Sequence, residues 1–596
     1  MYRAPVEDIA FTLKHVAGLA KALDDGRLGD LSDDLVDAIL SEAGRFASEE
    51  VAPLGAVGDT QGARLVDGKV VVPDGWDALY RHWAEGGWNS LAAHPDFGGQ
   101  GLPHMLNVAA LEMWNSGSMA FALGPTLTMG AVEALTVHGA DALKAAYLPK
   151  MISGEWTGTM NLTEPHAGSD LGVMKTRAER RDDGSYRIFG QKIYITWGDH
   201  EITDNIIHLV LARLPDAPAG TRGISLFLVP KFLLDADGAP GARNDLHCHS
   251  LEHKLGIHGS PTCTMIYGDG RFGEEAGAFG YLIGEENRGL ACMFTMMNNA
   301  RLAVGMQGVA ICEAATQKAI AYARERTQGK APGWSGSGDK GGMSPIIEHP
   351  DVARMLLTMK ALTQGARAIC YTCAHATDMG HHSEGDEARQ WAERAALLTP
   401  IAKSFATDAG VDVASLGIQV HGGMGFIEET GAARLWRDAR IAPIYEGTNG
   451  IQAADLVTRK LPLSDGNQVR GLIADLKDIA EQVRSANDVG FGTTAERLTA
   501  SLADLEEATE WLLARLADGN VAAALSGATP YQRLFGLALT GVYLAKGALV
   551  TGEAGRDQRL LLCRFAAENL IAETAALKDR VVNGAESLAA ARVLFA

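Results

Sequence analysis

Three short segments of the chain combine glycine, hydroxyl and carboxyl residues in ways that could do chemistry. Residues 160–170 (MNLTEPHAGSD) form a stretch of small residues that leaves backbone N–H groups free to approach an anion or a carbonyl-rich ring. In residues 419–426 (QVHGGMGF) the glycines permit close approach of the backbone to a ligand. In residues 444–452, Glu446 offers a carboxylate that becomes a base where burial raises its pKa. Taken singly, each segment also fits an ordinary turn or a loop acid.

Other apparent motifs are better explained without chemistry. Residues 336–341 (GSGDKG) match the glycine pattern of a dinucleotide-binding loop but lie in a polar stretch, so a linker is predicted. Cys370 and Cys373 lack a second ligand pair, which favours two core thiols of a helix over a metal site. His381 and His382 indicate a solvated loop. No G-x-S-x-G elbow supports a hydrolase, and no metal site is predicted.

Composition limits the class of protein. With 596 residues, of which 47% are hydrophobic, the chain is expected to fold into two to four domains. A net charge of -20 argues against nucleic-acid binding. Seven cysteines do not suggest a disulfide framework, and the first residues lack the pattern of a signal peptide. The most apolar stretch, residues 534–544, is too short to span a membrane. We expect a cytoplasmic protein without a membrane span.

Hydrophobic spacing divides the chain into four zones of an α+β fold. Residues 1–155 and 286–465 follow helical spacing, the latter as a four-helix bundle, and residues 466–596 are an appended helical domain. Residues 156–285 contain short β-branched and aromatic runs bounded by Gly, Pro and Asp, which predict a middle antiparallel β-domain.

Three helical segments are indicated by apolar residues at helical spacing. One begins at Ser32-Asp33, and two lie in the appended zone. Their apolar positions are Leu35, Ile39 and Ala43; Leu472, Leu476, Ile479 and Val483; and Leu498, Leu502, Leu505 and Leu512.

Five motifs, in order, resemble those of the acyl-CoA dehydrogenase family. Residues 163–170 carry T-E-P-x-A-G-S-D in full. Residues 192–196 are similar to its W-I-T strand and residues 322–329 to its R-x-Q-F-G helix end. Residues 419–425 match Q-x-x-G-G-x-G, and residues 437–452 match R-D-x-x followed by I-Y-E-G-T-x-x-I-Q. The resemblance covers about residues 40 to 460 and implies an FAD-dependent oxidoreductase acting on acyl-CoA thioesters.

The resemblance also points to one group of enzymes within the family. The chain is longer than common family members, and residues 2–11 and 258–262 look like a long bacterial group that oxidises 3-methylmercaptopropionyl-CoA during dimethylsulfoniopropionate breakdown. The alternatives are a short- to medium-chain acyl-CoA dehydrogenase of β-oxidation, a flavin acyl-CoA oxidase, and a non-catalytic acyl-CoA-binding protein. The resemblance further implies an electron-transfer flavoprotein as acceptor and a homodimer.

Roles carried over from the family match single positions of this chain. Glu446 corresponds to the base that takes the α-proton of the thioester. Three positions correspond to the lining of the CoA thioester site: Ser169, Asn298 and Arg301. Twelve positions correspond to flavin contacts, some made from a neighbouring subunit: Leu162, Thr163, Ser169, Tyr194, Ile195, Thr196, Arg326, Gln328, Gln419, Gly422, Gly423 and Thr448.

The chain departs from the family pattern at four places. Tyr194 stands where Trp is common, and Asn298 replaces a common Asp. The Phe expected before Gly329 is missing, which leaves the register of Arg326 open by one residue. Some family members carry the base just before the position of Arg301, where this chain has Ala300. Because alanine cannot abstract a proton, this exchange favours Glu446.

Overall fold

The computed structural model describes residues 2–273, 275–335 and 342–595. Its contacts divide the chain into two compact units. The first, here the helical unit, contains Met1–Gly44, His104–Ser116 and Arg301–Ala596; the second, the sheet unit, contains Arg45–Pro103 and Gly117–Ala300. Residues 336–341, for which a linker is predicted, lie outside the described residues.

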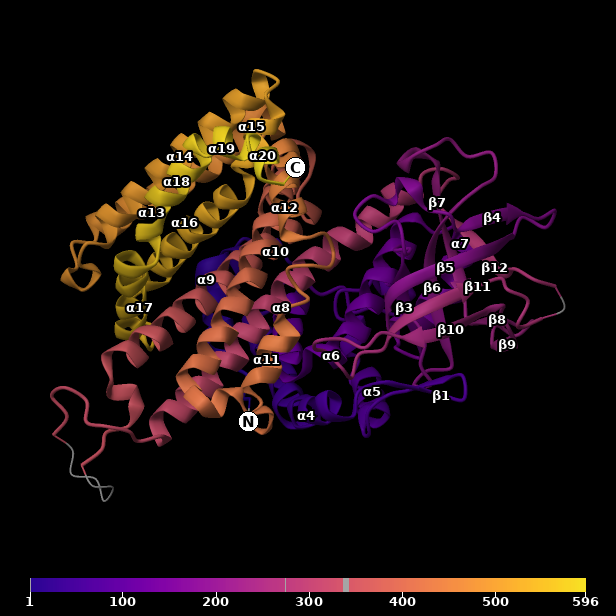
Figure 1. The fold of residues 1–596 in the computed structure, drawn as a ribbon, viewed down its shortest axis with the longest axis horizontal. Coiled ribbons are helices and arrows are strands. Elements are labelled where there is room, and N and C mark those ends of the chain that lie inside the picture. The colour runs from indigo at the N-terminus through magenta and orange to yellow at the C-terminus, as the bar shows by residue number, and fades with distance from the viewer. Residues whose placement is uncertain (1, 274, 336–341, 596) are drawn as a thin grey trace. The chain divides into compact units, whose positions relative to one another are not determined.

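The sheet unit combines strands with a few helices (Figure 1). Its helices are α4 (Ala52–Gln61), α5 (Trp76–Glu85), α7 (Asp141–Ile152) and most of α6 (His104–His138). Its strands are β1 (Arg64–Val66), β2 (Lys69–Val71), β3 (Trp156–Asn161), β4 (Arg177–Arg180), β5 (Tyr186–Thr196), β6 (Asn205–Arg213), β7 (Ile224–Pro230), β8 (Phe232–Leu234), β9 (Pro240–Arg243), β10 (Leu246–Leu251), β11 (Thr262–Tyr267) and β12 (Ala278–Ile283).

The main sheet has eight strands in the order β10-β11-β5-β12-β7-β6-β3, with β4 paired to β5 and β6. Its pairs are antiparallel except that β3 runs parallel to β6, as does a single β4–β6 pair. The predicted middle β-domain is therefore present, but it is not wholly antiparallel. Short apolar runs indicate a strand without its direction, and β4 and β5 intervene between the parallel partners in the chain.

The burial of strand β6 on both faces explains why its sequence is an almost continuous apolar run. Ile207 and Leu209 belong to one buried cluster, and Val210 and Ala212 to another. Because successive side chains of a strand point to opposite faces, both faces of the sheet are covered here.

The helical unit holds most of the long helices. They are α1 (Val6–Phe11), α2 (Leu19–Asp24), α3 (Asp33–Phe46), α8 (Gly289–Glu325), α9 (Pro350–His381), α10 (Gly385–His421), α11 (Ala432–Ala439), α12 (Asn449–Asp455), α13 (Asn467–Ser485), α14 (Thr494–Ala517), α15 (Val521–Ser526), α16 (Ala528–Leu549), α17 (Arg556–Asn569), α18 (Thr574–Asn583), α19 (Ala585–Ala589) and α20 (Arg592–Phe595), with α3 and α8 each continuing into the sheet unit.

The appended zone after residue 466 packs on the bundle. Helices α9 and α10 pair with each other, and α16 contacts both (Figure 1). The predicted apolar faces of α13 and α14 are confirmed, since Leu472 and Leu476 are buried and Leu498 and Leu502 are fully so. Cys370 and Cys373 are buried free thiols of α9.

The helix predicted after Ser32 is also present, and the Ser32 hydroxyl accepts from the backbone N–H of Leu35 at 3.2 Å. Its buried face agrees with the predicted one only in part: of Leu35, Ile39 and Ala43, Ala43 is fully buried and Ile39 is half-buried. Val36 and Leu40 are fully buried, whereas Leu35 is 44% exposed. Spacing every four residues fits two adjacent stripes of the helix, and packing selects between them.

The predicted α+β organisation is confirmed: helices, then a β-region, then helices, then an appended helical region. Within the described ranges, one helix is long and apolar enough to cross a membrane by length and composition. It is α6, and 72% of its most apolar window is buried, as expected for a core helix of a folded protein.

Candidate active site

Glu446 lies in the loop between α11 and α12, in a backbone conformation unusual for its type. Its φ is 54°, and that of Gly447 is 83°. A non-glycine residue in this left-handed region costs of order 1–3 kcal/mol and persists only where its surroundings hold it. The Gln452 side-chain amide donates to the carbonyl of Glu446 at 3.1 Å, and Lys403 Nζ donates to that of Gly447 at 2.9 Å. The loop that presents the carboxylate is therefore fixed by side chains of α10 and α12.

The surroundings of Glu446 suit proton abstraction near neutral pH. Burial raises the pKa of its carboxyl to about 7, while the positive charges of Arg301 and Lys403 act to lower it. A carboxylate with a pKa close to the working pH accepts a proton efficiently, and about half of it is ionised at that pH. Thr448 then caps α12 by accepting from the backbone N–H of Ile451 at 3.2 Å.

Arg301, predicted to line the substrate, is a buried residue of α8 beside the base. Its Nη1 lies 3.8 Å from Asp455 Oδ2, and its side chain is 8% exposed. Its charge acts on Glu446. Asn298 lies in the same helix, and its side chain is outside the described residues.

In the sheet unit, the predicted flavin loop is tied down by a buried ion pair. Lys192 Nζ lies 2.9 Å from Glu164 Oε1 and donates to the carbonyl of Leu162 at 2.9 Å. The backbone N–H of Ile193 donates to the carbonyl of Thr163 at 2.9 Å. The start of the loop is thereby held alongside the end of β5, which brings Leu162 and Thr163 next to the predicted contacts at residues 194–196.

The end of β5 presents an accessible aromatic ring. Tyr194 has a φ of 61° and is 60% exposed, and the pairing of β5 with β11 shifts register at this point. Bulges of this kind turn a side chain out of the regular alternation. Thr196 is half-buried, whereas Ile195 is only 2% exposed and its side chain belongs to the core, so a flavin contact of the Ile195 side chain is not supported. Ser169 is exposed.

These features fit a flat, hydrogen-bonding ring. A fixed loop, an exposed aromatic side chain and the half-buried Thr163 and Thr196 lie together at one end of β5. Aromatic stacking and hydroxyl or backbone hydrogen bonds are the contacts that such a ring uses. The donor set therefore suits a flavin.

The remaining predicted flavin contacts, apart from Thr448 at the start of α12, gather at one end of the helical unit. The ring of Tyr322, near the end of α8, stacks on that of His421 at the end of α10, with centroids 4.4 Å apart. Arg326 follows α8 and donates to the side chain of Gln328 at 3.2 Å. Each predicted contact at this end is exposed: Arg326, Gln328, Gln419, Gly422 and Gly423. A Cβ built on either glycine meets open space, so the glycine backbone is accessible to a ligand.

Three residues that hold the base loop were missed by the sequence interpretation. Lys403 and Gln452 capture the two carbonyls of the loop, and Asn449 accepts from Lys403 Nζ at 2.8 Å. The one available signal was the charge of Lys403 within the apolar run of residues 400–406 of α10. A lone cation on a buried helix face requires a partner, and a strained loop can supply one.

The comparisons with known proteins agree with this geometry. Four family profiles match in succession: acyl-CoA dehydrogenase N-terminal domain at residues 34–155, middle domain at 159–269, C-terminal domain at 287–461, and "acetyl-CoA dehydrogenase C-terminal like" at 472–592. The chain belongs to the acyl-CoA dehydrogenase family. It is accordingly an FAD-dependent oxidoreductase, and residues 472–592 of the appended zone match a profile of their own.

Individual relatives extend over nearly the whole chain. A 3-methylmercaptopropionyl-CoA dehydrogenase of Ruegeria pomeroyi is 44% identical over 98% of this chain and 99% of its own length. Among solved structures, Caenorhabditis elegans ACDH-11 in complex with C11-CoA has a TM-score of 0.77 at 22% identity, covering 98% of this chain and 95% of its own. An acyl-CoA dehydrogenase of Bacillus anthracis complexed with FAD has a TM-score of 0.71 at 20% identity, covering 96% and 92%. At these identities the two structures show that the fold is shared.

Proposed function

We propose that Glu446 is the base of this acyl-CoA dehydrogenase and removes the α-proton of the thioester. The observation that carries this proposal is the placement of its carboxyl. It is held on a fixed loop, its pKa is raised by burial to about 7, and Arg301 and Lys403 keep it from rising further. Replacement by Gln keeps the shape of the side chain and removes the base. The test is whether Glu446→Gln forms the α,β-unsaturated product.

The other predicted residues would bind and orient. Bound FAD supplies the acceptor for the hydride that leaves the β-carbon. The family resemblance assigns the backbone N–H of Glu446 as a donor to the thioester carbonyl, where negative charge develops as the α-proton leaves. It assigns the isoalloxazine ring to Leu162, Thr163, Ser169, Tyr194, Ile195 and Thr196. The fixed loop and the exposed Tyr194 support that assignment.

For the substrate, we propose 3-methylmercaptopropionyl-CoA, oxidised to 3-methylthioacryloyl-CoA. The support is the 44% identity over almost the full length of both chains to a dehydrogenase of that name. A steady-state panel containing this thioester, butyryl-CoA and isovaleryl-CoA tests the proposal. The highest kcat/KM is expected for the thioether. A preference for butyryl-CoA by tenfold or more would instead assign straight-chain β-oxidation.

We also propose a homodimer in which each chain completes the flavin site of its partner. Three apolar side chains surround the glycine turn at the end of α10: Met424, Phe426 and Ile427 are 50%, 85% and 45% exposed. Contiguous exposed apolar groups mark association surfaces. The polar residues beside them, Arg326, Gln328 and Gln419, are those matched to flavin contacts made across subunits in the family.

The electrons are proposed to pass to an electron-transfer flavoprotein in the cytoplasm. An oxidase on the same fold would pass them to oxygen. Rates of reoxidation of the substrate-reduced enzyme separate the two, with and without added electron-transfer flavoprotein. A dehydrogenase is reoxidised slowly in air and rapidly by its protein acceptor. We further propose that the chain divides functionally at residues 155, 285 and 465.

A further inference from the structure

Two successive residues of the base loop adopt left-handed backbone conformations, and the carbonyl of each is bound by a buried side chain. Gln452, which is fully buried, binds that of Glu446, and Lys403, also fully buried, binds that of Gly447. Gly447 has no room for a side chain, since an added Cβ would lie 2.7 Å from the Gln452 amide nitrogen. The direction in which the Glu446 side chain points from the loop therefore depends on these two hydrogen bonds.

Lys403 does more than fill space in α10. Its ammonium donates to the carbonyl of Gly447 at 2.9 Å and to Asn449 Oδ1 at 2.8 Å. Both acceptors are neutral oxygens, so neither of these two hydrogen bonds neutralises the positive charge of Lys403. Burial lowers the pKa of Lys403 to about 8, and the charge of Glu446 acts to raise it. The ammonium and the carboxylate thus stabilise one another's charged forms.

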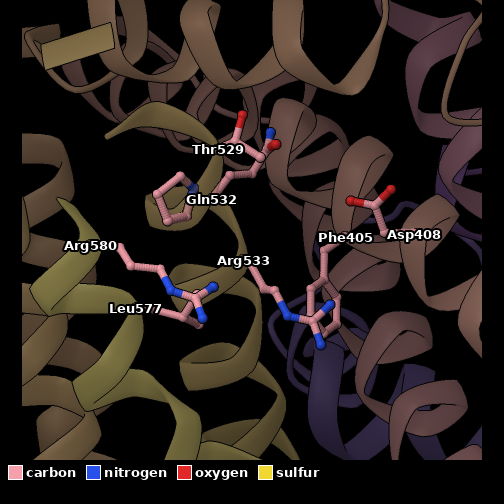
Figure 2. Close-up of a pocket in the computed structure, with 8 residues that line it drawn as sticks. Phe405, Asp408, Thr529, Gln532, Arg533, Leu577 and Arg580 are labelled. Carbon is pink, nitrogen blue, oxygen red and sulfur yellow. The ribbon is translucent and has the colours of Figure 1, made fainter. Parts of the chain in front are cut away.

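Asn449, which accepts from Lys403, also connects the base loop to a second charged residue of α10. Its side-chain N–H donates to Asp408 Oδ1 at 2.7 Å. Asp408 lies five residues after Lys403 in α10 and borders a cavity of about 240 Å³ (Figure 2). Helices α16 and α18 supply most of the other cavity wall, including Arg533 and Arg580. The first residue of α12 is therefore bound to α10 through both atoms of its side-chain amide: the oxygen accepts from Lys403, and the nitrogen donates to Asp408 and to the Ser404 carbonyl.

We propose that Lys403 is a positioning residue for the base: it holds the Glu446-Gly447 turn and supplies a fixed positive charge beside the carboxylate. This inference rests on the proposed function of Glu446. Removing the side chain would free the Gly447 carbonyl, relax the turn and weaken the ionised form of the base. A misplacement of about 1 Å in such a group costs roughly 100-fold in rate.

Several charged groups of the helical unit surround the base. Arg301 of α8 and Lys403 of α10 favour its ionised form. Asp455 of α12 lies 3.8 Å from Arg301 and partly offsets that charge. Asp408 of α10 acts on Lys403. Arg301 has the larger effect of the two on the pKa of Glu446, but Lys403 also binds the backbone of the base loop, so we expect Arg301 not to compensate for the loss of Lys403.

The test compares Lys403→Met and Lys403→Arg with a matched control, Lys546→Met. Lys546 is a partly buried lysine of α16 in the same unit, and its Nζ donates to the Val16 carbonyl at 2.7 Å. For Lys403→Met we expect kcat to fall about 10- to 100-fold with little change in KM. The acidic limb of kcat/KM should move to higher pH, since an isolated buried carboxylate has a higher pKa. In Lys403→Arg the acidic limb of kcat/KM should return to its wild-type pH, and Lys546→Met should match the wild type in both kcat and the limb.

A second readout isolates the proton step. In (methylthio)acetyl-CoA the β position is sulfur, so the thioester has acidic α-hydrogens and no hydrogen on a β-carbon to transfer. Exchange of its α-hydrogens with deuterium oxide, followed by mass spectrometry, should slow in Lys403→Met to the same extent as turnover. The inference is overturned if the FAD-loaded Lys403→Met enzyme keeps the wild-type kcat, acidic limb and exchange rate.

The two proposals fail differently. If Glu446→Gln still exchanges α-hydrogens and turns over, the assignment of the base is wrong. If Glu446→Gln is inactive and Lys403→Met is unaffected, the base stands and only the positioning role of Lys403 is lost. The inference is also overturned if Lys403→Met is slow while its acidic limb and its rate of α-hydrogen exchange are those of the wild type, and Lys546→Met is equally slow. That result would show that Lys403 has a purely structural role.

Discussion

The Lys192 ammonium lies 2.9 Å from the Glu164 carboxylate, and both side chains are almost completely buried. Burial by itself would raise the pKa of Glu164, but Lys192 and the backbone N–H groups of Lys175 and Thr176 hold it below its ordinary value. Burial lowers the pKa of Lys192 to about 8. The pair joins the loop at residues 162–170 to β5, so the proposed flavin contacts depend on it.

Lys192→Met should therefore weaken both the fold and retention of FAD. Leaving Glu164 buried without its partner costs about 3–5 kcal/mol, and the carbonyl of Leu162 loses its donor. The flavin-to-protein absorbance ratio and the denaturation midpoint report the two effects. The double variant Lys192→Met/Glu164→Gln should recover part of the stability, because no unpaired charge remains buried. Wild-type flavin content and stability in Lys192→Met would contradict this role.

The rate of the enzyme should depend on ionisation of Glu446. Because burial raises its pKa to about 7, kcat/KM should fall about tenfold per pH unit well below that value, as the base becomes protonated. A pH series at saturating electron acceptor measures this limb. A profile that stays flat down to about pH 5, near the ordinary value for Glu, would contradict the proposed environment of the carboxyl.

Glu446→Gln should stabilise the protein at alkaline pH. The pKa in the folded state, about 7, lies above the ordinary value of 4.5. The favourable contribution of the protonated group is thus complete below about pH 4.5 and is lost as the pH rises through about 7. At about 1.4 kcal/mol per pKa unit, Gln should gain about 1–3 kcal/mol at pH 8 and nothing in acid. Urea titrations at both pH values measure it, with the exposed Glu429→Gln as control; equal midpoints at pH 8 would contradict it.

Phe426→Asp should dissociate the proposed dimer. Phe426 is 85% exposed next to the glycine turn, whereas Val489 is 94% exposed at a site distant in sequence from it. A charge at an apolar interface is costly to desolvate, so Phe426→Asp is expected to elute as a monomer with reduced FAD content, and Val489→Asp as a dimer. Multi-angle light scattering of both variants decides this. A dimeric, fully flavinated Phe426→Asp would exclude this face as the interface.

The sequence predicted those features that depend on local spacing or on ordered motifs. The Ser32 cap follows from its start signal, the buried leucines of α14 from helical spacing, and strand β6 from its apolar run. The role of Glu446 stays a prediction from its motif. Strand direction was not predictable, because β3 and β6 become parallel only through the path of the strands between them. Leu35 and Val36 lie on adjacent stripes of the helix, about 100° apart, and tertiary packing buries Val36. The support of the base by Lys403 is a long-range contact, which neither residue's neighbours encode.

Anaerobic mixing of the FAD-loaded enzyme with 3-methylmercaptopropionyl-CoA tests the central claim most directly. The loss of visible flavin absorbance reports one reduction of the bound FAD by the substrate, because no external electron acceptor is present. In the wild type we expect rapid bleaching and formation of 3-methylthioacryloyl-CoA. In Glu446→Gln, with the same flavin content, bleaching should be slower by about 10²–10⁴-fold. Bleaching of Glu446→Gln at the wild-type rate would show that another group takes the proton and would contradict the account.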